Sequence, residues 1–377
     1  MEENKTLKRW KITAIIALCG LLGMSMLYAG ERNRNRDNAI EEETTGEAVE
    51  PLEENENWLS LWNEDARAKN ELESYMKQIT DENNPSFIPV ENRIAVFDLD
   101  GTLYCETDPT YFDYQLFMHR VLEDEDYRDK ASESELATAA KIRELIETGK
   151  SAKGLEVEHG KGIASSFAGM TLKEFNDYVR AFREQPAPGY DNMKRGDAFY
   201  LPMVEIVDYL QENDFTVYIV SGTDRLIVRG ICDGISFFHI PANRIIGSDE
   251  LITTKKQGDT DGLDYVFTED DELIMAGEFI IKNLKMNKVS VIAQEIGIQP
   301  VLSFGNSTGD SSMAEYVTSS NPYKSLAFML CCDDTVRENG NETKARQMRE
   351  LCEEFGWIPI SMKDDWKTIY GDEVTRK

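Results

Sequence analysis

This sequence contains little histidine and little positive charge. Only 3 of its 377 residues are histidine, and 70 acidic residues outnumber 41 lysines and arginines, which gives a formal net charge of −29. Because positive charge is needed to bind the phosphates of nucleic acids or anionic lipids, this balance argues against both as partners. The three histidines lie far apart, without the spacing of metal ligands, so a histidine metal centre is not expected: His119, His159 and His239.

Cysteine is also scarce. One of the six cysteines is Cys19, and the other five are Cys105, Cys232, Cys331, Cys332 and Cys352. Outside the cytoplasm one or two disulfides could form among these five, but their pairing cannot be read from the sequence. No His–Asp pattern supports Cys105 as a nucleophile.

One long uncharged apolar run, from Ile12 to Tyr28, stands near the start of the chain. It follows four basic residues: Lys5, Lys8, Arg9 and Lys11. This is the pattern of an export signal. The run is slightly shorter than the roughly 20 residues of a spanning helix, and Leu27 makes the cleavage site poor. We therefore predict that residues 1–30 are a signal peptide or an N-terminal membrane anchor, with the rest of the chain outside the cytoplasm.

Residues 31–56 are rich in charge and poor in apolar side chains. Arg32, Arg34 and Arg36 precede a series of glutamates that extends from Glu41 to Glu56. Such a segment cannot bury enough apolar surface to offset its chain entropy. We predict an acidic disordered linker here.

Two carboxylates stand at the end of a second apolar run, Ile94–Phe97, which predicts a buried strand. Asp98 and Asp100 follow it, with Gly101 and Thr102 directly after. Like charges this close are costly unless a hard cation such as Mg²⁺ takes their oxygens as ligands. Asp98 is then placed to attack phosphorus, and Asp100 to transfer the proton of the leaving oxygen. Gly101 permits a tight turn, and Thr102 can hold a phosphate oxygen.

The string D-L-D-G-T-L at residues 98–103 resembles the first motif of the haloacid dehalogenase (HAD) superfamily. The resemblance implies an α/β fold, a Rossmann-like parallel sheet with helices on both faces. It implies three further motifs in fixed order: a Ser or Thr after a second strand, a Lys, and acids after a last strand. The superfamily contains phosphatases, phosphomutases, dehalogenases and ATPases, and an acid at the position of Asp100 implies a phosphatase or phosphomutase.

The second and third motifs have clear candidates. The apolar run 215–220 ends at Ser221 and Gly222, and the hydroxyl and a backbone N–H there would hold phosphoryl oxygens. Lys288 opens the helix-like stretch 288–297 and is the candidate for the Lys that neutralises the nucleophile and the phosphate. Two other lysines lie close enough in sequence to compete: Lys282 and Lys285.

The last motif departs from the common pattern. The run 300–304 leads into G-N-S-T-G-D at residues 305–310. Asn306 stands where the superfamily usually has a carboxylate that binds Mg²⁺, and Asp310 matches the second acid. An Asn carbonyl is still a suitable hard ligand, although it carries no charge. The expected metal ligands are therefore Asp98, Asp100 through its main-chain carbonyl, Asn306 and Asp310. A G-N-S-x-G-D motif resembles a secreted, phosphoserine-phosphatase-like branch of the superfamily.

The segment between the first two motifs, residues 104–214, is too long for one crossover. Helical apolar spacing over 112–122 and 133–148, and a capping-box pattern at Thr171 and Glu174, predict a mainly helical insertion. An insertion at this place resembles the C1 type of cap, and residues 57–103 and 215–377 would form the catalytic core.

Three other features complete the prediction. Glu106 loosely resembles a substrate-binding Glu of phosphoserine phosphatases, and a plain surface Glu is the alternative. Apolar residues near helical period predict a helix over 58–79. Short apolar segments between glycines predict a β-rich excursion over 245–279 with a polar hairpin tip near Gly262.

Together these patterns predict an exported, Mg²⁺-dependent phosphatase that hydrolyses small phosphomonoesters through an aspartyl-phosphate. A phosphotransferase of the same fold is one alternative. A catalytically weak, surface-attached binding protein is another, and only Asn306 favours it. The expected partner is a small phosphorylated metabolite, with membrane contact only through the N-terminal segment. The sequence indicates neither the substrate nor the oligomeric state.

Overall fold

A computed structural model describes residues 58–377. The predicted export segment and linker lie outside these described residues. Within residues 58–377, no helix combines the length and apolar character that crossing a membrane requires.

A seven-stranded sheet forms the centre of the described chain, in the order β5-β4-β3-β1-β6-β7-β8. All neighbours pair in parallel except β4 and β5, which form an antiparallel hairpin. The predicted parallel α/β sheet is therefore confirmed, and the carboxyl ends of its parallel strands meet at one edge. The strands are β1 (Ile94–Phe97), β3 (Thr216–Asp224), β4 (Ile245–Thr254), β5 (Leu273–Ile281), β6 (Leu302–Gly305), β7 (Leu326–Cys331) and β8 (Ile358–Ser361).

Both faces of the sheet are covered by helices, as the alternation of side chains along the strands shows. In β1, Phe97 packs into the core that includes α2 (Arg67–Thr80) and α7 (Leu201–Glu212). Val96 points to the opposite face, toward α9 (Met286–Val291) and α10 (Ser311–Thr318). In β7, the alternate residues Ala327, Met329 and Cys331 pack against α11 (Glu342–Phe355).

The first described helix is shorter than predicted. It begins at Arg67, not near residue 58, because the preceding chain is held by contacts to distant residues. Trp62 is fully buried beside Trp366, with ring centroids 5.8 Å apart, and its indole N–H donates to the carbonyl of Pro202. Leu59 and Trp62 are buried, but in turns rather than in the predicted helix.

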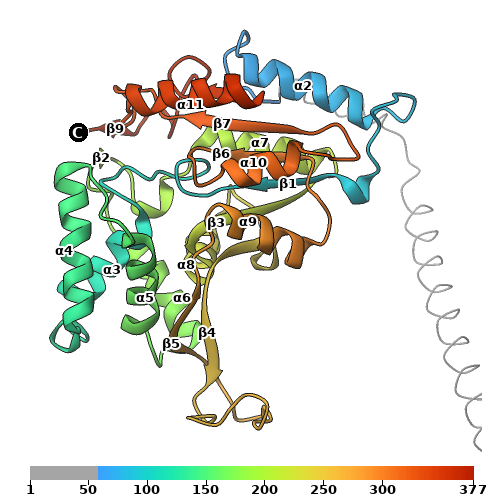
Figure 1. Ribbon diagram of the computed structural model, residues 1–377. Helices are drawn as coiled ribbons and strands as arrows, with labels where there is room; N and C mark the ends of the chain where they lie inside the picture. The colour runs from blue at the N-terminus through green and yellow to red at the C-terminus, as the bar shows by residue number, and fades with distance from the viewer. Residues whose placement is uncertain (1–57) are drawn as a thin grey trace, which may run out of the picture. The chain divides into compact units, whose positions relative to one another are not determined.

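Five α-helices follow β1 before β3, and four of them form a group beside the β4–β5 hairpin (Figure 1): α3 (Phe112–Leu122), α4 (Glu133–Thr148), α5 (Leu155–Ser166) and α6 (Leu172–Arg183). The predicted bounds of α3 and α4 are confirmed, and both oxygens of the Thr171–Glu174 capping box make their bonds. The helix α5 was not predicted, because its glycines weaken the pattern. Gly162 allows Phe117 to pack closely on it. The helix α7, which falls in the predicted insertion, packs on β3, and the boundary between core and cap stays a prediction.

The predicted β-rich excursion is confirmed as the β4–β5 hairpin, and α5 packs against β5. The chain end adds a small sheet of β2 (Tyr190–Asp191) and β9 (Thr375–Arg376). The five cysteines of the described region are free thiols.

Candidate active site

The carboxyl end of β1 brings Asp98 and Asp100 to the edge of the sheet. The N–H of Asp98 donates to the carbonyl of Phe304 in β6 at 2.9 Å, which fixes the chain at the strand end. Gly101 follows with a φ of +76°, and a Cβ there would collide with the side-chain amide of Asn306. Glycine is therefore needed at residue 101 for two reasons: it allows the turn, and it leaves room for the side chain of Asn306.

Lys288 lies at the centre of the site. Its Nζ donates to Asp98 Oδ1 and to Asp310 Oδ1, both at 2.6 Å, and its side chain is fully buried. Neither Lys282 nor Lys285 forms an ion pair within residues 58–377, so Lys288 alone of the three candidates reaches Asp98. Lys288 lies in the first turn of α9, which begins at Met286 and not at Lys288 as predicted, because Lys285 turns the chain with a φ of +55°.

Asp310 organises the last motif. Its Oδ2 accepts hydrogen bonds from the N–H groups of Asn306 and Ser307 at 3.2 and 3.1 Å, and from the Ser307 hydroxyl at 3.1 Å. With Oδ1 bound to Lys288, both of its oxygens already accept hydrogen bonds. The structure thus shows Asp310 as the residue that holds Lys288 and the loop, and its role as a metal ligand stays a prediction.

Burial and the neighbouring charges shift the pKa values of Asp98 and Lys288. Burial, and then the charge of Asp310, raise the pKa of Asp98 to about 7, although Lys288 acts in the opposite direction. Burial alone would lower the pKa of Lys288, but Asp310 and Asp98 outweigh it and the pKa is raised. Lys288 therefore stays protonated between the two acids.

Asp100 has the character of an acid that keeps its proton. Burial, with the charges of Asp113 and Asp98, raises its pKa well above the ordinary value. Its Oδ2 accepts a hydrogen bond from Thr223 Oγ1 at 2.7 Å, and its buried Oδ1 has no partner among the described residues. Thr223 was not singled out in the sequence, because 123 residues separate it from Asp100.

The second motif differs in detail from the prediction. The strand β3 does not end at Val220 but continues to Asp224. Ser221 is fully buried, and its Oγ accepts a hydrogen bond from the N–H of Thr223 at 3.0 Å. Gly222 and Thr223, not Ser221, line the cavity described next. Thr102 is likewise buried, and its hydroxyl has no partner among residues 58–377.

A cavity of about 390 Å³ opens over these residues. Its wall combines the motif residues with side chains from the insertion, among them Glu106, Tyr111, Asp113, Tyr114 and Glu156. Glu106 and Asn306 both lie close to Gly101, and burial raises the pKa of Glu106 to about 7, although the side chain of Asn306 acts in the opposite direction. The structure thus brings Asp98, Asp100, Glu106, Gly222, Asn306 and Asp310 together around one cavity, with Lys288 beneath it.

The residues present fit a hard divalent cation. Lys288 binds only one oxygen of Asp98, and Asp98 and Asn306 both line the cavity. The side chain of Asn306 carries an amide oxygen, which is a suitable ligand for a hard cation. Within residues 58–377 no group of three acidic, His or Cys side chains is gathered for a metal. An ion here would therefore depend on Asn306 and a main-chain oxygen as well as on carboxylates.

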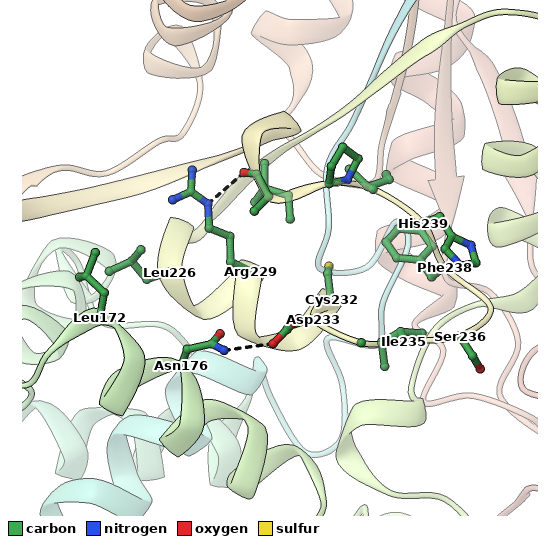
Figure 2. Close-up of a pocket in the computed structure, with 15 residues that line it drawn as sticks. Leu172, Asn176, Leu226, Arg229, Cys232, Asp233, Ile235, Ser236, Phe238 and His239 are labelled. Atoms are coloured by element: carbon green, nitrogen blue, oxygen red, sulfur yellow. Dashed lines mark hydrogen bonds between the residues drawn. The ribbon is translucent and has the colours of Figure 1, made fainter. Parts of the chain in front are cut away.

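A larger cavity of about 840 Å³ lies elsewhere, between α6, α8 (Arg225–Cys232) and the loop before β4. Figure 2 shows two hydrogen bonds among its polar groups: Asn176 donates to Asp233, and Arg229 donates to a backbone carbonyl, that of Ala242. Arg180 also contacts Asp233 at 3.2 Å. With no unpaired carboxylate and no motif residue in its wall, this cavity lacks the groups that the chemistry needs.

Comparison with solved structures finds chains of low identity. One is a conserved functionally unknown protein from Anaerococcus prevotii DSM 20548, 16% identical over 78% of this chain and 92% of that chain, with a TM-score of 0.47. Another is cytosolic 5'-nucleotidase IIIB bound to cytidine, which is 13% identical over 81% of this chain and 91% of that chain, with a TM-score of 0.47. A third is a phosphoserine phosphohydrolase-like protein from Francisella tularensis subsp. tularensis SCHU S4. It is 14% identical over 68% of this chain and 92% of that chain, with a TM-score of 0.37.

No curated protein matches the sequence. The family model of the haloacid dehalogenase-like hydrolases matches residues 95–315, which is more than half of the chain and spans all four motifs. The chain therefore belongs to the haloacid dehalogenase-like hydrolases.

Proposed function

We propose that this hydrolase is a phosphatase that cleaves small phosphomonoesters through an aspartyl-phosphate on Asp98. The observation that carries the proposal is the buried Asp98–Lys288–Asp310 arrangement beside Asp100, whose pKa burial raises. It holds a nucleophilic carboxylate next to a fixed positive charge and an acid two residues away. These are the groups that phosphoryl transfer requires.

In the first step an Asp98 oxygen forms a bond to phosphorus while the bond from phosphorus to the alcohol oxygen breaks. Asp100 gives its proton to that leaving oxygen. In the second step Asp100 takes a proton from water, the water oxygen bonds to phosphorus, and the bond from phosphorus to Asp98 breaks. Lys288 keeps the carboxylate of Asp98 oriented throughout. Mg²⁺, held by Asp98, Asn306 and the main chain at Asp100, would neutralise charge on the phosphoryl oxygens.

The export of the protein is also part of the proposal. It rests on the basic residues and apolar run of residues 5–28, which lie outside the described structure. The substrate would then be a small phosphorylated metabolite outside the cytoplasm, reached by a chain that is anchored or released.

Chelation tests the proposed function directly. We expect the full chain to hydrolyse p-nitrophenyl phosphate with Mg²⁺ and to lose at least about 100-fold in rate with EDTA, because the acidic site needs a cation to accept a dianionic phosphate. Added Mg²⁺ should restore the rate. Phosphate release is the measurement, and equal rates with and without EDTA would contradict a metal-dependent mechanism.

The unusual Asn306 gives a second prediction. In Asn306→Asp, a carboxylate replaces a neutral ligand, so half-maximal activation should require about 5- to 10-fold less Mg²⁺. The variant should also melt at a lower temperature in EDTA, because the new charge faces Glu106. Asn243→Asp, at an exposed position before β4, adds the same charge away from the cavity and should change neither value. An unaltered Mg²⁺ requirement in Asn306→Asp would exclude residue 306 as a ligand.

A further inference from the structure

The wall of the active-site cavity carries acids and lysines from different segments of the chain. Its lining residues between 104 and 156 include three acids and no base: Glu106, Asp113 and Glu156. The lysines of the wall come from other segments: Lys282 and Lys285 near the start of α9, and Lys344 of α11. The cavity therefore offers carboxylates to a cation as well as lysines to an anion.

Asp113 is the sharpest feature of the acidic side. It lies in α3, is only 2% exposed, and its Oδ1 has no hydrogen-bond partner among the described residues. A buried carboxylate without a partner is costly unless a cation completes the site. Asp113 therefore has the properties of one half of an ion pair.

The neighbouring histidine does not supply the missing charge. His159 Nε2 lies 3.2 Å from the main-chain oxygen of Asp113, and Nδ1 lies 3.7 Å from Oδ2. Burial lowers the pKa of His159 to about 4, although the charge of Asp113 acts in the opposite direction. The ring is thus neutral near pH 7, with its proton placed on Nε2 by the carbonyl. Lys282 is near enough to affect His159, but it makes no ion pair with Asp113 in the described region.

Two tyrosines of the cavity wall lie next to Asp113 in the sequence, and burial, then the charge of Asp113, raise the pKa of Tyr114. Tyr111 and Tyr114 flank Asp113 in sequence, both line the cavity, and their ring centroids are 5.2 Å apart. An aromatic face next to a carboxylate is a favourable environment for an ammonium group. The charge of Asp113 also acts on Asp100, which donates its proton to the leaving oxygen. The cation would therefore lie a short chain away from that oxygen.

We propose that Asp113, with Tyr111 and Tyr114, binds an ammonium group on the alcohol half of the substrate. The substrate class is then the phosphate esters of short amino alcohols. This inference rests on the proposed phosphatase function, and it assigns ammonium binding to the side of the cavity that faces the leaving group.

A matched pair of substrates tests the proposal in the full chain with Mg²⁺. Phosphoethanolamine and 2-hydroxyethyl phosphate differ only in an ammonium group replacing a hydroxyl. We expect kcat/KM to favour phosphoethanolamine by at least about 30-fold, since one good ion contact contributes about 2 kcal/mol. In Asp113→Asn the preference should fall below about 3-fold. Ethanolamine should inhibit hydrolysis of p-nitrophenyl phosphate in the wild type and not in this variant.

Glu250→Gln is the matched control. Glu250 is also an acid with both oxygens buried and unpartnered, but it lies outside this cavity. Its replacement should leave the preference unchanged. Tyr114→Phe should also keep the preference, because the ring remains, whereas Tyr114→Leu should reduce it.

Three outcomes would overturn the inference. The first is a wild type that hydrolyses p-nitrophenyl phosphate but treats the two matched esters alike. The second is an Asp113→Asn variant in which both esters lose the same factor, since the residue would then be structural. The third is a folded, Mg²⁺-supplied wild type that hydrolyses no ester at all, and this result alone would also overturn the proposed function.

Discussion

Replacing Asp98 by Asn should lower kcat for p-nitrophenyl phosphate by at least about 10⁴-fold, because the amide cannot form the phosphoenzyme bond. The side chain keeps its size, and Lys288 retains Asp310 as a hydrogen-bond partner at 2.6 Å. The expected loss is therefore chemical rather than structural. Release of inorganic phosphate under saturating substrate and Mg²⁺ measures it.

The control for Asp98→Asn is a matched change at an exposed carboxylate. Asp259→Asn alters the connection between β4 and β5, far from the motifs in the sequence, and should keep the wild-type rate. The melting temperature of Asp98→Asn should not fall by more than a few degrees, because the substitution removes one of two like charges buried beside Lys288. More than a tenth of the wild-type rate in a folded Asp98→Asn would show that water attacks phosphorus directly or that another residue is the nucleophile.

The catalytic side of the site could be predicted from sequence because its residues lie at the ends of strands. Three of the four motifs combine an apolar run with a polar terminus, and a parallel sheet brings those termini to one edge. Lys288, 190 positions from Asp98, lies in a helix, and it was identified from the family resemblance instead. The end of β3 could not be predicted in this way, because the local sequence around Ser221 is compatible with a strand and with a turn.

The substrate side could not be predicted in the same way. Asp113 and Tyr114 lie in α3 and Tyr111 directly precedes it, and the apolar pattern of this stretch is explained by packing alone. Their arrangement around the cavity depends on how α3 meets the sheet, which is set by tertiary contacts. Thr223 was missed for the same reason, since its role appears only through a hydrogen bond to Asp100. Only the fold shows that Asp113 is buried without a partner.

Replacing Lys288 by Met should affect both stability and activity, since this side chain is fully buried between two carboxylates. Met has nearly the same length but leaves Asp98 and Asp310 uncompensated, and breaking a buried ion pair in this way costs about 3–5 kcal/mol. We expect that loss in the free energy of unfolding, measured by urea denaturation in EDTA. Hydrolysis should fall by at least about 10³-fold, because no fixed positive charge remains beside the nucleophile. Lys285→Met, on an exposed side chain three residues earlier, is the matched control and should change the free energy of unfolding by less than about 0.5 kcal/mol.

The pH dependence of this loss separates a charge effect from a packing effect. Asp98 already has a pKa of about 7, raised by burial and by Asp310 even with Lys288 present. An acid whose pKa is raised in the folded state binds its proton more tightly than in the unfolded chain. Its contribution to stability is present below the unfolded value, near 4, and is lost as the pH rises through the folded value. Without Lys288 the folded pKa rises further, so Lys288→Met should be destabilised more at pH 8 than at pH 5.5. An equal loss at both pH values would mean that the methylene chain of Lys288, and not its charge, stabilises the centre of the site.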